Sequence, residues 1–138
     1  MKQSLSIPAR PSELSVLRAA ILDFIGEDLD EKNKGRVILA IDEAVSNVIV
    51  HGYAYDESKM IDIEMESDPD SFIFIVSDSA KEYNPLESVS PDIERYHEDG
   101  QSSGLGVDIY RRIMKTRYER SSNGGNRLIL VKEKKNEN

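Results

Sequence analysis

The most constraining feature of this sequence is the segment at residues 34–50, where apolar side chains cover much of a helical surface. A helix that is apolar around so much of its circumference is stable only when it is largely buried. Other elements of the chain must therefore cover it, and we expect it to end at Gly52. The apolar residues that recur at helical spacing are Val37, Ile38, Ile41, Val45, Val48 and Ile49.

A second helix and a short strand are predicted before this segment. Residues 12–25 carry apolar side chains at helical spacing, with Ser12 as a candidate cap and Gly26 as the stop. Residues 5–7 indicate a short strand that stops at Pro8. The N-terminal third of the chain is thus expected to run from a strand into two helices.

A hairpin of two strands is predicted after the buried helix. Residues 61–66 alternate between apolar and acidic side chains, which is typical of a strand with one solvated face. Residues 72–76 are all apolar, which indicates a strand in the centre of a sheet. Residues 68–70, Asp-Pro-Asp, form the turn between them.

The second half of the chain begins with a long irregular segment. Residues 81–103 contain two prolines, a glycine and several charges, and a loop of this length in a compact domain is often a functional lid. We expect a helix from residue 104 to about residue 115, and a strand from Tyr118 onward. A turn at residues 123–126 then leads to a last strand at residues 128–131.

Length and charge limit the classes of function. The chain has 138 residues, which fits one domain covering residues 1–138, and the order of its elements predicts an α+β fold. In that fold the helices cover one face of a mixed, mostly antiparallel sheet. The formal net charge of −8 disfavours nonspecific binding to nucleic acid or anionic membrane. The sequence has no signal peptide and no apolar run of the roughly 20 residues that a membrane helix needs, so we expect a cytoplasmic protein.

Two polar residues stand out on the buried helix. Glu43 and Asn47 are four positions apart, so they share one face. Carboxylate and amide oxygens suit Mg²⁺, which binds proteins through few groups and keeps water and phosphate oxygens as further ligands. The carboxylate could instead accept a proton from an attacking hydroxyl. The same spacing also fits a polar stripe that faces solvent, and the helix alone leaves these alternatives open.

Two further segments have the chemistry of a ligand site. Asp78 directly follows the buried strand, where a carboxylate can accept a hydrogen bond from an adenine amino group, although turns and caps also use aspartate. Gly104 and Gly106 lie where a helix begins, so the backbone there can approach a phosphate and offer N–H donors. A helix-initiating turn also uses glycine, and no lysine follows as in a Walker loop.

The order of these three segments, with a long acidic loop between the last two, is more specific than any one of them. It resembles the nucleotide-binding fold shared by DNA gyrase, Hsp90, histidine kinases and MutL, the Bergerat fold. The resemblance covers nearly the whole chain and is strongest to the small bacterial anti-sigma factor serine/threonine kinases. The matching stretches are residues 41–47 with 51–53, residue 78 with 84–85, residues 104–106 with 111–114, and residues 124–128.

The resemblance implies a role for each matching residue. Glu43 would be the general base on a substrate serine, and Asn47 would coordinate the Mg²⁺ that bridges the ATP phosphates. Asp78 would receive the adenine amino group. The phosphate-binding segment would comprise Ser103, Gly104, Leu105 and Gly106, preceded by an ATP lid at about residues 86–103. This set of parts agrees with phosphoryl transfer, which needs charge neutralisation and positioning more than covalent chemistry.

The implied function is that of a protein serine kinase that phosphorylates an anti-sigma factor antagonist and sequesters a sigma factor. Its partners would be the antagonist and the sigma factor, and a homodimer formed through the N-terminal strand is a further expectation. One position departs from the family, which usually has glycine where this chain has Ala80 in the ATP site. Alanine restricts positive φ, and this favours the alternative of a nucleotide- or protein-binding regulatory module without kinase activity. A detached histidine-kinase ATPase domain is a third alternative, disfavoured because no phosphoacceptor helix precedes the motif.

Overall fold

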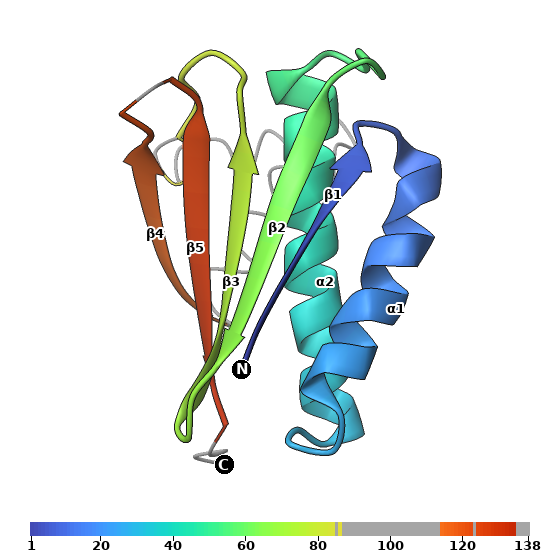
Figure 1. Cartoon of the computed structure of the whole chain (residues 1–138), viewed down its shortest axis with the longest axis vertical. Coiled ribbons are helices and arrows are strands. Elements are labelled where there is room, and N and C mark those ends of the chain that lie inside the picture. Colours follow the sequence, from blue (N-terminus) through green and yellow to red (C-terminus); the bar gives the residue numbers. More distant parts are fainter. Residues whose placement is uncertain (85, 87–113, 123, 135–138) are drawn as a thin grey trace, which may run out of the picture.

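The described part of the protein forms a five-stranded sheet with two α-helices packed against it (Figure 1). This computed structural model describes residues 1–84, 86, 114–122 and 124–134. The strands lie in the order β1-β2-β3-β5-β4, and each of these neighbouring pairs is antiparallel. The predicted α+β fold is confirmed, and the pairing is wholly antiparallel among the described strands. The strands are β1 (Lys2–Pro8), β2 (Met60–Ser67), β3 (Ser71–Asp78), β4 (Lys115–Arg120) and β5 (Asn126–Glu133).

The main core lies between the sheet and the helices α1 (Leu14–Ile25) and α2 (Glu31–Asn47). Successive side chains of a strand point to opposite faces, so each strand contributes alternate residues to this core. From β3, Phe72 and Phe74 are fully buried in it. Strand β3 is central in the sheet, as its unbroken apolar sequence predicts.

The buried helix α2 begins earlier than its apolar pattern indicates. The carboxylate of Asp30 accepts a hydrogen bond from the backbone N–H of Asn33 at 2.8 Å, which caps the first turn and starts the helix at Glu31. After Asn47 the helix widens into a π-helical turn, η2 (Val48–Gly52), which ends at the glycine as predicted. Such turns occur often at functional sites.

The N-terminal elements differ from their prediction at their ends. A short 3₁₀ turn, η1 (Pro11–Glu13), precedes α1, and Ser12 does not cap that helix. Strand β1 is longer than predicted and includes Pro8, which is tolerated because β1 is at the edge of the sheet. The predicted stop at Gly26 is confirmed, since α1 ends at Ile25.

Strand β4 also begins earlier than predicted, because Lys115 is already its first residue. The helix expected over residues 104–115 is therefore wrong at its end, and the rest of it lies outside the described residues. The β4–β5 hairpin is confirmed, with the N–H of Ser121 donating to the carbonyl of Gly125 at 2.9 Å. Within the described part of the chain, neither α-helix is long and apolar enough to cross a membrane.

Candidate functional site

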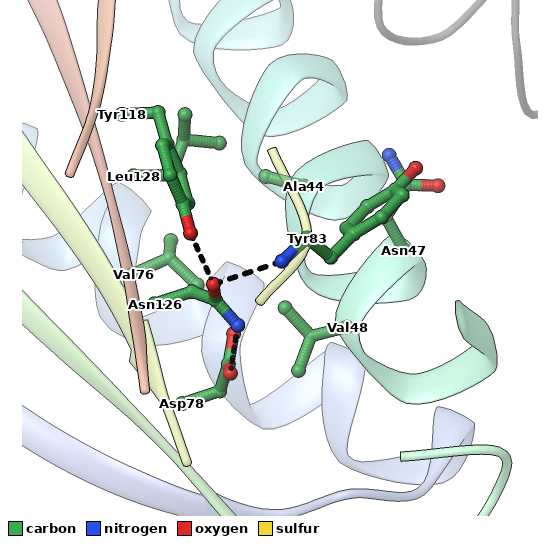
Figure 2. Close-up of a pocket in the computed structure, with 9 residues that line it drawn as sticks. All are labelled: Ala44, Asn47, Val48, Val76, Asp78, Tyr83, Tyr118, Asn126 and Leu128. Atoms are coloured by element: carbon green, nitrogen blue, oxygen red, sulfur yellow. Dashed lines mark hydrogen bonds between the residues drawn. The ribbon is translucent and has the colours of Figure 1, made fainter. Parts of the chain in front are cut away.

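A small pocket, partly open to solvent, lies between α2 and the sheet (Figure 2). It is lined from one side by the last turns of α2 and from the other by the ends of β3, β4 and β5. The pocket brings together Asn47 and Asp78, which the sequence predicts as parts of one site. Its lining residues are Ala44, Asn47, Val48, Val76, Asp78, Tyr83, Tyr118, Asn126 and Leu128.

The Asp78 carboxylate is held at the end of β3 by two donors. Its Oδ1 accepts hydrogen bonds from the backbone N–H of Ala80 at 2.9 Å and from Nδ2 of Asn126 at 2.8 Å. Within the described residues, Oδ2 accepts no hydrogen bond. Because one oxygen is fully used and the other is not, the carboxylate is oriented and still has an acceptor to offer.

Asn126 connects the strand ends to the loop that follows β3. Its side-chain oxygen accepts from the N–H of Tyr83 at 3.1 Å and from the hydroxyl of Tyr118 (Figure 2). The same oxygen accepts from a guanidinium nitrogen of Arg120 at 3.2 Å. Its nitrogen also donates to the carbonyl of Lys81 at 3.0 Å. A buried amide with this many partners holds the surrounding groups in one arrangement.

Gly125 lets the β4–β5 hairpin approach the end of β3. Its φ is +108°, and a Cβ added there would lie 2.2 Å from the backbone oxygen of Asp78. No side chain fits at that distance, so glycine is required both by the backbone conformation and by the close contact. The pair Gly124-Gly125, read in the sequence as a turn, therefore also shapes the site.

The wall formed by α2 has unpartnered polar groups. Asn47 is buried, yet its Nδ2 has no hydrogen-bond partner among the described residues. Such a group is unusual in a folded protein and calls for an explanation such as a ligand or ion. The side-chain oxygen of Asn47 is not among the buried unpartnered atoms, so it is the end that a ligand can reach.

Glu43 lies one turn before Asn47 on α2 and does not line the pocket. Its side chain is half-buried, and this burial, reinforced by the negative charge of Asp42, raises the pKa of its carboxyl group. A raised pKa is typical of carboxylates that exchange protons in a reaction. The structure thus brings Asn47 and Asp78 into one pocket and leaves Glu43 beside it.

Ala80 adopts no left-handed conformation, since the described non-glycine residues with positive φ are Ala54 and Tyr55. Its N–H donates to Asp78, and its carbonyl accepts from Arg120 at 3.0 Å. The methyl group is buried, where a Cβ on Gly52 would come within 3.3 Å of it. The backbone strain considered for alanine at this position is therefore absent.

Tyr83 lines the pocket, and its ring lies 6.0 Å from that of His51 (centroid to centroid). The candidate site residues predicted from the sequence do not include Tyr83, Asn126 or Tyr118. The signal for Asn126 is its place directly after the glycine pair, within the stretch 124–128 that resembles the small kinases. The predicted phosphate segment, Ser103, Gly104, Leu105 and Gly106, lies outside the described residues, as does the lid apart from Leu86.

This fold and pocket define a histidine kinase-like ATPase domain. The model of that family matches residues 7–132, and the chain belongs to the family. Membership implies ATP binding.

Two groups of proteins show similarity along the sequence. The chain is 27% identical to the anti-sigma F factor of Clostridium beijerinckii over 98% of its own length and 95% of that protein. It is 28% identical to the anti-sigma F factor of Clostridium novyi, over 97% and 95% of the two chains. It is 25% identical to the serine/threonine-protein kinase BtrW of Bordetella bronchiseptica, over 67% and 66%.

A solved structure shares the fold. The SiaB–SiaC complex from Pseudomonas aeruginosa contains a chain that matches with a TM-score of 0.64. The match covers 95% of this protein and 89% of that chain, at 11% identity. At this identity the likeness concerns the fold alone.

Proposed function

We propose that this protein is an anti-sigma factor-type serine kinase. It binds ATP with Mg²⁺, phosphorylates a serine of an anti-sigma factor antagonist, and sequesters a sigma factor when the antagonist is phosphorylated. The observation that carries the proposal is that Asn47 and Asp78 line one pocket in a histidine kinase-like ATPase domain. The names of the relatives, anti-sigma F factor and serine/threonine-protein kinase, support the choice of partner and reaction.

The base of ATP is proposed to lie against the sheet wall of the pocket. Oδ2 of Asp78 has no protein donor among the described residues, so it can accept a hydrogen bond from the 6-amino group of adenine. Val48, Val76 and Leu128 supply apolar surface around it. A few oriented polar atoms in an otherwise apolar pocket are typical of sites for aromatic ligands.

The triphosphate is proposed to extend toward α2 and the segment with Gly104 and Gly106. The side-chain oxygen of Asn47 is assigned to Mg²⁺, because this buried amide has no protein partner and amide oxygens suit a hard cation. When bound, Mg²⁺ neutralises charge on the phosphate oxygens. Ser103 and Leu105 are assigned to the same phosphate segment.

Glu43 is proposed as the general base. Its carboxylate takes the proton of the substrate serine as the hydroxyl oxygen bonds to the γ-phosphorus. The bond from the γ-phosphorus to the oxygen that bridges to the β-phosphate breaks, and ADP leaves with that electron pair. The raised pKa of Glu43 makes its carboxylate a stronger proton acceptor than an exposed glutamate. Its half-buried position beside the pocket leaves it reachable for a protein substrate.

The alternative, a regulatory module without kinase activity, was favoured by Ala80 alone. That argument is removed, because Ala80 adopts no positive φ and its backbone contacts to Asp78 and Arg120 are intact. Glu43 is present together with Asn47, and a module that only binds nucleotide would not need this general base. A cytoplasmic location and a homodimer through β1 are parts of the same proposal.

The proposal is tested by incubating the protein with labelled ATP, Mg²⁺ and the antagonist-like proteins encoded in the same genome. We expect label on a serine of one antagonist. The Glu43→Gln variant should bind ATP–Mg²⁺ as the unmodified protein does, while its phosphorylation rate falls by roughly 10²- to 10⁴-fold, because the base is lost and the metal ligand stays.

Calorimetry with ATP, with and without Mg²⁺, separates the two roles. Asn47→Ala should abolish the magnesium-dependent part of the affinity, and Ser46→Ala on the neighbouring face serves as its matched control. Unchanged magnesium dependence in Asn47→Ala would contradict the role of Asn47 as a magnesium ligand. Full phosphorylation by Glu43→Gln would contradict the role of Glu43 as the general base.

A further inference from the structure

The polar cluster on the sheet wall contains a residue to which the proposed reaction gives no role. Asn126 is buried at the start of β5 and makes hydrogen bonds to the end of β3, to the loop after it and to β4. Neither the proton transfer nor the magnesium site uses it. Its contacts bear instead on how Asp78 faces the pocket.

The orientation of the Asn126 amide is fixed by chemistry. A backbone N–H and a guanidinium can only donate, so the atom that faces Tyr83 and Arg120 must be the side-chain oxygen. The hydroxyl of Tyr118 adds a third donor to the same oxygen. The nitrogen is thereby turned toward Asp78 and the carbonyl of Lys81, and the amide cannot flip without placing donor against donor.

This fixed amide determines which oxygen of Asp78 meets a ligand. Oδ1 accepts from Asn126 and from the N–H of Ala80, so the carboxylate cannot rotate without losing both bonds. Oδ2 remains as a pure acceptor at the pocket. An acceptor in this position attracts a base that carries an amino group and repels one that carries a carbonyl oxygen there.

We propose that Asn126, held by Tyr118 and Arg120, is a positioning residue that determines base specificity, so that the site takes 6-aminopurine nucleotides and rejects 6-oxopurine nucleotides. This inference rests on the proposed function, because it concerns the nucleotide of that same site. In this proposal, the selectivity for the base depends on residues of β4 and β5 as well as on Asp78.

The test compares ATP with inosine triphosphate, which has the same sugar and triphosphate but a 6-oxo group. We expect the unmodified protein to bind ATP more tightly by on the order of 100-fold or more, since a site built around a hydrogen bond discriminates strongly against its loss. The ratio of the two dissociation constants is the readout. Partial unfolding or a weaker phosphate site lowers both affinities together and leaves that ratio unchanged.

Asn126→Asp is the decisive variant. It keeps the shape of the side chain and the oxygen that faces Tyr83, Tyr118 and Arg120, but it places a carboxylate oxygen against Oδ1 of Asp78. Two carboxylates at this distance cannot both stay ionised and aligned. We expect the preference for ATP to fall by about tenfold or more, because Oδ2 is no longer a fixed acceptor.

Two further variants complete the series. Tyr118→Phe removes one of the three donors to Asn126 and keeps the ring, so the ratio should fall by about threefold, the size of one ordinary hydrogen bond. Glu119→Gln is the control. Glu119 lies between Tyr118 and Arg120 on the opposite face of β4, where its carboxylate pairs with Arg127 at 3.4 Å. The ratio should not change in this control.

The outcomes distinguish this inference from the proposed function. If the unmodified protein binds neither nucleotide, the proposed function fails and the role of Asn126 fails with it. If it prefers ATP and Asn126→Asp keeps that preference, the role of Asn126 alone is overturned. If Asn126→Asp does not fold, Tyr118→Phe decides, since an unchanged ratio there contradicts the inference and a reduced one supports it.

Discussion

Two buried asparagines line the pocket, one from α2 and one from β5, and their hydrogen-bonding surroundings differ. Asn47 on α2 is 4% exposed and Asn126 on β5 is 6% exposed, so burial does not distinguish them. The amide of Asn126 has hydrogen-bond partners for both of its polar atoms. The amide of Asn47 has none among the described residues, and its nitrogen is completely enclosed.

On the sheet wall the protein itself supplies the hydrogen-bond partners of the buried amide, whereas on the helix wall we propose that a ligand supplies them. A buried polar group without a partner costs stability, so it persists where function requires it. A saturated cluster instead orders its members before any ligand arrives. The sheet wall is thus expected to hold its shape in the free protein, whereas Asn47 on the helix wall is proposed to gain its partner in the nucleotide-bound state.

The largest effect on the sheet wall is expected from Gly125→Ala. The new Cβ would lie 2.2 Å from the carbonyl oxygen of Asp78, at a backbone φ of +108° that alanine rarely adopts. We expect the free energy of unfolding to fall by about 3 kcal/mol or more, since overlap and strain combine. Urea unfolding of the purified variant measures it.

Gly124→Ala is the matched control for that substitution. Gly124 also has a positive φ, of +91°, but a Cβ there meets nothing within 4 Å. The strain alone should cost about 1 kcal/mol. An equal decrease in the free energy of unfolding for both variants would show that the backbone near Asp78 can move to accommodate the new Cβ. The sheet wall would then not be more rigid than the helix wall.

A smaller effect is expected from removing each asparagine in turn. Asn126→Ala leaves the N–H of Tyr83 and one oxygen of Asp78 without their partner, and should cost about 2 kcal/mol of stability. Asn47→Ala removes a group that has no described partner, so its cost should stay below about 1 kcal/mol.

Thermal or urea unfolding of the two asparagine variants, without nucleotide, tests the comparison directly. A larger loss at Asn47 than at Asn126 would contradict it, because Asn47 would then have a partner in the free protein. Adding ATP and Mg²⁺ should reverse the ranking in part, since the unmodified Asn47 gains its proposed ligand and the alanine variant does not.

The elements of the fold could be predicted where local patterns decide them. The apolar surface of α2 and the unbroken apolar run of β3 identify both elements correctly. The predicted ends of the elements were less accurate, because the observed ends depend on single contacts. Asp30 starts α2 with one side-chain hydrogen bond, and the edge position of β1 allows Pro8 inside a strand.

In the candidate site too, some features could be predicted from the sequence and others could not. The proximity of Asn47 and Asp78 follows from the resemblance of the sequence to a family whose site uses both positions. The role of Asn126 could not be predicted, because its partners come from three separate segments that only the folded sheet brings together. The close approach of Gly125 to Asp78 is likewise a property of the sheet, since the local pattern of a glycine pair indicates a turn but not the element that the turn will contact.

The smallest expected effect concerns the pKa of Glu43, which lies on α2 beside the pocket. Burial, followed by the charge of Asp42, raises the pKa of Glu43, so Glu43 keeps its proton to a higher pH than an exposed glutamate does. A base works only when deprotonated, and the phosphorylation rate should therefore fall about tenfold per pH unit below that raised pKa. Asp42→Asn removes the neighbouring negative charge and should move this acid limb to lower pH, although it also removes the ion pair with Arg18 at 2.8 Å. The rate at saturating ATP, measured from acidic to neutral pH in both proteins, gives the two limbs. A limb that stays at the same pH in Asp42→Asn would contradict the contribution of the Asp42 charge, and the raised pKa of Glu43 would then be due to burial alone.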